Sequence, residues 1–254
     1  MSLSVTLRKG EDKAVTLGHP SYLWRFGQER RLRLIQGYVP LEGKNILDVG
    51  CGVGMYLQAM RAFSEGVYGV DIDTERAAQA HQLLSHIVIA PAEQLPFAQG
   101  SFDVVLLHEV IEHVEDDRHT VREAYRVLTW GGRMIILAPN RLYPLETHGI
   151  IWRGQYHFGN IPLVNWLPGP LRDRLAPHAR AYTRRDLRRL LAGLQVRVLV
   201  HTQIFPGYDK IATRWPVLGQ ALRRVTYSLE RSPARLFALS HFLVAEKQDE
   251  TQGS

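Results

Sequence analysis

The sequence predicts an α/β fold in which a seven-stranded sheet carries helices on both faces. Short apolar runs of strand length alternate with segments of helical periodicity along most of the chain. The first apolar run ends in the glycine-rich turn "GCGVG", residues 50–54. Parallel neighbours need helical crossovers, so this alternation is what such a sheet requires. The length of 254 residues fits a single domain, 1–254.

The expected elements follow one another in regular order. Residues 22–39 have apolar positions at helical spacing and end before Pro40, which predicts an opening helix. Strands are predicted at 44–50, 66–72, 86–90, 102–108, 131–140, 195–205 and 241–247. Helices are predicted at 55–63, 75–85, 119–128 and 183–194, the last with Thr183 as its N-cap.

Two segments interrupt the alternation. Residues 142–181 are rich in aromatic residues, Pro and Gly, and we expect them to form a substrate cap beyond a cofactor core at about 20–141. Residues 206–235 form a second, partly helical insertion. Aromatic side chains of the cap are expected to wall an apolar or sugar-stacking pocket. The run "IPLVNWLPGPLRDRL" favours packing onto the sheet over docking at a membrane interface, so we expect at most a weak peripheral membrane contact.

Composition bounds the cellular setting. The formal net charge is +6, and arginines crowd the second half of the chain, which suits phosphates, an anionic substrate or an anionic surface as well as a solvated helix face. Cys51 is the only cysteine, so an intrachain disulfide is excluded. The first 20 residues contain no uninterrupted apolar run of signal-peptide type, and we expect a cytoplasmic protein.

The glycine turn and one acidic residue predict a nucleoside ligand. Gly50, Gly52 and Gly54 stand at the carboxyl end of the first strand, where open parallel sheets place their ligands. Asp71 ends the second strand about 20 residues later, where a carboxylate accepts both ribose hydroxyls. Each feature alone also fits a structural turn, but the pair favours nucleoside binding.

Five motifs then occur together in order. They are "ILDVGCGVG", "VYGVDID", "PAEQLPF", "SFDVVLLHEVIEHV" and "VLTWGGRMIILAPNR", covering residues 44–141. In order and spacing they resemble the class I S-adenosylmethionine-dependent methyltransferases, which have a Rossmann-like fold. The resemblance implies S-adenosylmethionine as cofactor and S-adenosylhomocysteine as product. The residues agree, because a dinucleotide loop wants glycine where Met55 stands.

The resemblance also implies positions for the cofactor. Asp48 and the turn from Gly50 through Cys51 to Gly52 and Gly54 would hold the methionine end, and Asp71 the ribose. Ile72 would pack on adenine, Ala92 and Glu93 would lie at its edge, and the backbone at His108 would meet the amino acid moiety. Pro91 replaces an aspartate common in the family, so the adenine contact must rest on Glu93 or on backbone groups.

Methyl transfer to an oxygen benefits from a base. His113 in "HEVIEHV" and His148 in "LETHG" are the candidate catalytic bases. The zinc-peptidase spacing H-E-x-x-H is absent. Glu109, Glu112 and His113 share one face if they lie on a helix, and E-x-x-E-H resembles a metal-binding pattern of ubiquinone-biosynthesis O-methyltransferases, with His148 as a fourth ligand for Mg²⁺ or Mn²⁺. We therefore expect the site to bind no metal ion, and a divalent metal site at these four residues is the alternative.

The sequence therefore predicts a methyltransferase that acts on an oxygen of a small or lipid-linked molecule. A non-catalytic S-adenosylmethionine-binding regulatory module and an RNA 2′-O-methyltransferase are the alternatives, and a dehydrogenase ranks below them. No amino-methylating N/D-P-P-Y motif and no appended RNA-binding module occur, so we expect no nucleic acid partner.

Overall fold

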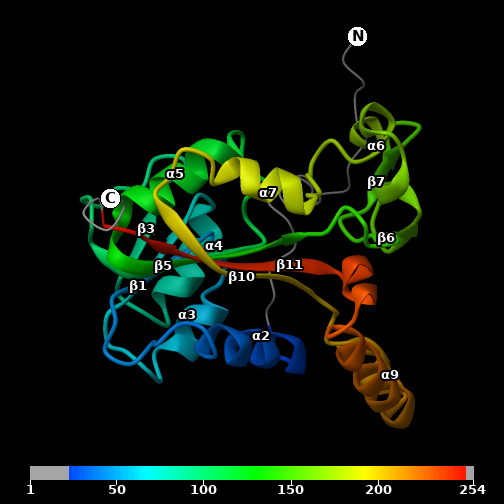
Figure 1. The fold of residues 1–254 in the computed structure, drawn as a ribbon, viewed down its shortest axis with the longest axis horizontal. Coiled ribbons are helices and arrows are strands. Elements are labelled where there is room, and N and C mark those ends of the chain that lie inside the picture. The colour runs from blue at the N-terminus through cyan, green and yellow to red at the C-terminus, as the bar shows by residue number, and fades with distance from the viewer. Residues whose placement is uncertain (1–22, 250–254) are drawn as a thin grey trace.

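The computed structural model describes residues 23–249, and the central sheet has seven strands in the order β10-β11-β5-β4-β1-β2-β3 (Figure 1). Its strands are β1 (Ile46–Val49), β2 (Val67–Asp71), β3 (Ile87–Ile89), β4 (Phe102–His108), β5 (Leu128–Pro139), β10 (Val196–Ile204) and β11 (Ser240–Lys247). All seven predicted strands are confirmed. Tyr22, the first residue of the predicted opening helix, lies outside the described residues.

Six strands run in one direction, and β11 runs against them. β1 pairs in parallel with β2 and β4, and β4 with β5. β11 is antiparallel to both β5 and β10, so the sheet is mostly parallel with one reversed strand. The chain leaves β10 at the edge where the parallel strands end, and its insertion stays at that edge. The next strand, β11, therefore starts from this same edge and runs in the opposite direction to β10, so no crossover connection is needed.

Helices cover both faces of the sheet. α5 (Asp117–Val127) and α7 (Arg184–Leu190) pack on one face, and α2 (Phe26–Gln36) and α3 (Met55–Met60) pack on the other, with α4 (Thr74–His81) beside β2 and β3 (Figure 1). Thr183 is the N-cap of α7: its hydroxyl accepts the N–H of Asp186, and the Asp186 carboxylate accepts the N–H of Thr183. This capping prediction is confirmed.

The two irregular segments both lie at the carboxyl ends of the parallel strands (Figure 1). The cap contains β6 (Leu145–Glu146), β7 (Ile150–Trp152), β8 (Gln155–His157), β9 (Ile161–Pro162), the 3-10 helix η1 (Val164–Trp166) and α6 (Gly169–Leu175). The second insertion contains α8 (Asp209–Arg214), α9 (Pro216–Leu229) and the 3-10 helix η2 (Pro233–Phe237). Among residues 23–249, no helix has the length and apolarity needed to cross a bilayer.

Candidate functional site

The glycine-rich turn links β1 to α3 through left-handed backbone. Gly50, Gly52 and Gly54 have φ of 68°, 55° and 84°. A Cβ at Gly50 would also lie 2.5 Å from Cγ2 of Val110, whereas one at Gly52 would meet nothing within 4 Å. Gly50 is therefore fixed by both conformation and space, and Gly52 by conformation alone.

Asp71 ties this turn to the loop after β2. One carboxylate oxygen accepts the N–H of Gly52 at 2.7 Å, and the other accepts the N–H of Asp73 at 2.8 Å. The side chain is buried. Because both oxygens accept backbone N–H groups, the charge of Asp71 holds the shape of the turn, and each oxygen keeps a second lone pair for a ligand.

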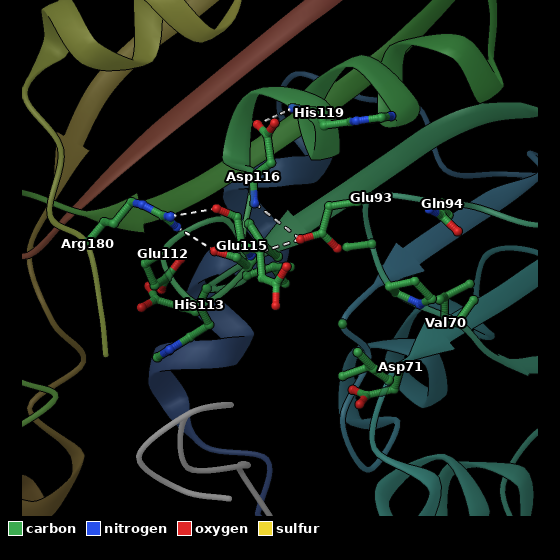
Figure 2. Close-up of a pocket in the computed structure, with 18 of the residues that line it drawn as sticks. Val70, Asp71, Glu93, Gln94, Glu112, His113, Glu115, Asp116, His119 and Arg180 are labelled. Carbon is green, nitrogen blue, oxygen red and sulfur yellow. Dashed lines mark hydrogen bonds between the residues drawn. The ribbon is translucent and has the colours of Figure 1, made fainter. Parts of the chain in front are cut away.

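A cavity of about 800 Å³ opens beside Asp71 and continues along the sheet edge to the loop after β4. Figure 2 shows Asp71 and Glu93 on one side of it, and Glu112, His113 and Arg180 on the other. Five of the predicted cofactor residues line this cavity: Gly50, Asp71, Ile72, Ala92 and Glu93. The other five do not line it: Asp48, Cys51, Gly52, Gly54 and His108.

Asp48 lies under the turn and adds a second buried carboxyl. Burial, together with the neighbouring charge of Asp71, raises the pKa of Asp48 to about 8. Burial likewise raises the pKa of the Cys51 thiol, whose side chain packs in the core beneath the turn. The two carboxyl groups make this end of the site a place where a positive charge is favoured.

Glu93 and Arg180 hold the loop that precedes α5 (Figure 2). One oxygen of Glu93 accepts the N–H of Glu115 at 2.9 Å and that of Asp116 at 3.4 Å. Arg180 donates to the carbonyl oxygens of Val114 at 2.6 Å and Glu115 at 2.8 Å. The cap residue Arg180 and the core residue Glu93 thus fix the same loop, and sequence reasoning missed the Arg180 contact because no local pattern links positions 66 residues apart.

His108 points toward α2 and away from the cavity. Its Nε2 lies 3.3 Å from Nη1 of Arg31, and its ring packs against Tyr56 at a centroid distance of 4.6 Å. Burial, with a smaller contribution from the Arg31 charge, lowers the pKa of His108 to about 3, so the ring is neutral and accepts from Arg31. Arg25, six residues before Arg31, is the exposed N-cap of α2.

The residues after β4 form turns and not a helix, so the expectation that positions 109, 112 and 113 share a helical face is wrong. Glu109 has φ of 56°, which reverses the chain before a regular helix can start, and α5 begins only at Asp117. The turns nevertheless bring together Glu112, His113 and, from the cap, His148: one ligand-type atom from each lies within 4.8 Å of the others. Glu109 is not part of this group.

Glu112 is the unusual member of the cluster. Its side chain is 1% exposed, and no N–H or hydroxyl group of the described residues donates to its carboxylate oxygens; its side-chain partner is the carboxyl of Glu109, to which it can bond only through a shared proton. Burial and the neighbouring Glu109 charge raise the pKa of Glu112 well above its usual range. His148 Nε2 stands 4.0 Å from Oε1 of Glu112. A buried carboxyl without donors is costly unless a proton or a cation joins it.

Both histidines are oriented through their other nitrogen. His113 Nδ1 lies 3.2 Å from the carbonyl oxygen of His178, and His148 Nδ1 lies 3.2 Å from Oε1 of Glu146. Each Nδ1 therefore carries the proton and donates, which leaves each Nε2 with a free lone pair. Burial lowers the pKa of His113 to about 4, so its ring is neutral.

Comparison with known proteins agrees with this geometry. Residues 47–136 match the family model described as a methyltransferase domain. This segment is similar to the methyltransferase domains that the family model describes. It spans β1 to β5, the glycine turn, Asp71 and the Glu112–His113 pair. The match supports S-adenosylmethionine, and not a nicotinamide dinucleotide, as the cofactor of the methyltransferase domain.

Two relatives and one solved structure show which proteins this chain resembles. The ubiquinone biosynthesis O-methyltransferase of Pseudomonas putida is 36% identical over 121 residues, 44% of this chain and 51% of the relative. That of Mesorhizobium japonicum is 27% identical, over 75% of this chain and 72% of the relative. A methyltransferase structure from Mesorhizobium loti superposes with a TM-score of 0.61 at 20% identity, over 87% of this chain and 98% of that one.

The fold of the methyltransferase domain does not fix its chemistry. The cyclase SpnF superposes with a TM-score of 0.56 at 18% identity, covering 87% of this chain and 81% of its own. The chain also spans only about half the length of the Pseudomonas relatives that it matches. Function must therefore be argued from the site.

The cluster of Glu112 and His113, which line the cavity, with His148, which lies beside them and outside the lining, fits a divalent cation. Glu112 is a buried carboxyl without an N–H or hydroxyl donor among the described residues, and each histidine has the tautomer that leaves Nε2 available. The observed ligand set has two imidazole nitrogens and one carboxylate, which favours Mn²⁺ or Zn²⁺ over the Mg²⁺ considered from sequence.

Proposed function

We propose that the protein is an S-adenosylmethionine-dependent methyltransferase that methylates an oxygen atom of a small or lipid-linked molecule. One observation carries the proposal: a single cavity of about 800 Å³ reaches from Asp71 and Ile72 to Glu112 and His113. Ligand cavities in proteins commonly measure about 300–1,000 Å³. The cavity therefore has room for a nucleoside at one end and part of an acceptor at the other.

The chain offers a partner for each charge of the cofactor. Asp71 offers carboxylate oxygens to the ligand, and Asp48, whose raised pKa keeps its carboxyl protonated in the absence of a positive group, would ionise when the cofactor's ammonium or sulfonium group approaches. Arg31, beside His108, suits its carboxylate. When bound, S-adenosylmethionine would supply an electrophilic methyl group to an acceptor oxygen, with S-adenosylhomocysteine as the leaving group. The relatives named as ubiquinone biosynthesis O-methyltransferases support oxygen as the accepting atom.

His148 is the favoured base. Its Nδ1–H is fixed by Glu146, whose own pKa is lowered to about 2: burial raises it, but the hydrogen bond from His148 and the charge of Arg172 outweigh that effect. This carboxylate orients the ring and stabilises the imidazolium that forms when Nε2 takes the acceptor hydroxyl proton. His113, whose ring centroid lies 5.2 Å from that of His148, packs against it and holds the second lone pair at the cavity.

The same residues suit a metal-assisted version of the reaction. Glu112, His113 and His148 would hold the divalent cation, which when bound acts as a Lewis acid on the acceptor hydroxyl. Under either version Glu146 and the His178 carbonyl keep the two imidazoles in position.

Calorimetric titration tests the cofactor assignment first. S-adenosylhomocysteine is expected to bind, and NAD and NADP are not. Failure of the folded protein to bind the homocysteine compound overturns the proposal. Binding without turnover on any catechol, phenol or alcohol acceptor would instead favour the regulatory module, and turnover restricted to RNA would favour the 2′-O-methyltransferase.

A histidine pair tests the base once an acceptor is found. His148→Gln is expected to lower kcat by about 10²-fold while S-adenosylhomocysteine affinity stays unchanged. The matched control is His157→Gln, an exposed histidine of the same insertion. Equal activity of the two variants would remove His148 from the mechanism.

A further inference from the structure

Exposed hydrophobic side chains are concentrated on the two insertions. Among the described residues, 20 large hydrophobic side chains are exposed, and 13 of them lie in the cap (142–181) or between β10 and β11 (205–239). Val217 is 83% exposed and Val225 58%. Scattered exposed hydrophobic residues are normal, but this concentration marks a surface that binds something.

The two insertions form one continuous face. The rings of Trp166 in the cap and Phe237 in η2 lie 6.3 Å apart, and Figure 1 shows the cap and α9 extending from the same end of the sheet. On α9, four apolar side chains follow helical spacing along one side: Leu218, Leu222, Val225 and Leu229. Three of them are exposed, Leu218 to 49%, Val225 to 58% and Leu229 to 37%. An amphipathic helix with an uncovered apolar side projects from the body of the protein.

The two insertions together carry a net charge equal to that of the whole chain. The cap has four arginines and two acidic residues, and the segment 205–239 has six basic and two acidic residues. Together they carry +6, which equals the net charge of the entire chain, so the remainder is neutral. This separation points to a partner that is itself anionic.

The acidic residues of the second insertion do not neutralise its surface. Asp209 pairs with Arg223 at 3.1 Å, and Glu230 pairs with Arg30 of α2. Arg224 and Arg231 are exposed and form no ion pair with any residue of 23–249. Exposed arginines therefore flank the apolar stripe of α9, the arrangement of helices that lie in the interface of an anionic bilayer.

We propose that the α8–α9 hairpin, with the adjoining cap, docks the protein on anionic membrane surfaces. The apolar stripe enters the interface while the arginines meet anionic headgroups. The cavity then opens near the surface from which a lipid-linked acceptor would be drawn. The docking itself needs no acceptor and no cofactor, so it can be tested whether or not the proposed methyl transfer is correct.

Sedimentation with vesicles tests this surface in the full chain. The probe is a vesicle of phosphatidylcholine with 30% phosphatidylglycerol, compared with pure phosphatidylcholine. We expect the wild type to bind the anionic vesicles and to lose binding in high salt. Arg224→Glu/Arg231→Glu is expected to weaken partitioning by at least about tenfold, since each basic residue near such a surface contributes measurably. Leu218→Asp/Val225→Asp, within the stripe, is expected to abolish it.

Matched variants elsewhere on the surface serve as controls. Arg118→Glu/Arg122→Glu on α5 changes the charge equally, and Ile89→Asp on the edge strand β3 removes an exposed hydrophobic side chain. Both should bind vesicles like the wild type, and every variant should keep its S-adenosylhomocysteine affinity. No wild-type binding, or equal loss in the α5 control, overturns the proposal. Dimerisation that the α9 variants abolish, without vesicle binding, would assign the face to a second copy of the chain.

Discussion

Asp71 serves both the turn and the ligand. Asp71→Ala is expected to weaken S-adenosylhomocysteine binding by more than about tenfold, because a charge-assisted hydrogen bond contributes about 1.5–3 kcal/mol. Calorimetry measures the affinity. Asp103→Ala is the control, since Asp103 also accepts a backbone N–H, that of Asn45, but lies outside the cavity. Equal losses in the two variants would show a purely structural role.

Glu112 makes stability depend on pH in a direction opposite to that of most carboxyl groups. Its pKa is raised in the folded protein, so as pH rises above about 4.5 the unfolded chain loses this proton before the folded one, and stability falls by up to about 1.4 kcal/mol per pH unit. Glu112→Gln removes the titration. The variant should be more stable than the wild type at pH 8 and gain nothing at pH 4, as measured by urea unfolding.

The same variant tests the metal site. A bound cation stabilises the folded state in proportion to the logarithm of its concentration. Mn²⁺ or Zn²⁺ should therefore raise the Tm of the wild type and leave that of Glu112→Gln unchanged. An equal rise in both proteins would place the cation elsewhere.

Gly50 and Gly52 should differ when each is replaced by alanine. Both need left-handed backbone, which disfavours alanine by about 1–2 kcal/mol. Only at Gly50 does the new Cβ also collide with Val110, at 2.5 Å. We expect Gly50→Ala to lose more stability than Gly52→Ala, and Val110→Ala to recover part of the loss. Equal melting temperatures for the two single variants would contradict the close approach.

Among the elements, the cap depends on one buried ion pair. Arg172 of α6 is 1% exposed and donates to Glu146 at 2.8 Å, with further bonds to the carbonyls of Ala176 and Ala179. Arg172→Met leaves the buried Glu146 uncompensated and should cost about 3–5 kcal/mol. Chemical unfolding measures this loss. Arg174→Met on the same helix, at an exposed position, should cost little.

The cofactor core was predictable from sequence because its signals are local. Apolar runs predict every strand of the sheet, and Thr183 predicts the start of α7. The turns at 109–115 were misjudged because helical spacing was preserved in the letters while Glu109 adopted φ of 56°. The contacts of Arg172 and Arg180 join segments far apart in the chain, and no periodicity reports such pairings.

In the molecule as a whole, buried histidines and buried carboxyl groups have opposite effects on the free energy of unfolding as pH falls. Burial is the largest cause of the lowered pKa values of five histidines, which are His108 and His201 (about 3), His113 and His241 (about 4) and His178. Below pH 6.5 the unfolded chain binds these protons first, so each histidine destabilises the fold as pH falls toward those values. Asp48 and Glu112, with raised pKa values, act in the opposite direction over the same range.

The balance predicts a loss of stability in acid. Five histidines against two carboxyl groups leave a net uptake of up to about three protons on unfolding, or up to about 4 kcal/mol per pH unit between pH 6.5 and 5. Urea unfolding of the cofactor-free protein measures the slope. Glu112→Gln removes one opposing group, so its slope should be steeper than that of the wild type by about one third. A wild-type slope of zero or of opposite sign would show that the carboxyl groups outweigh the buried histidines.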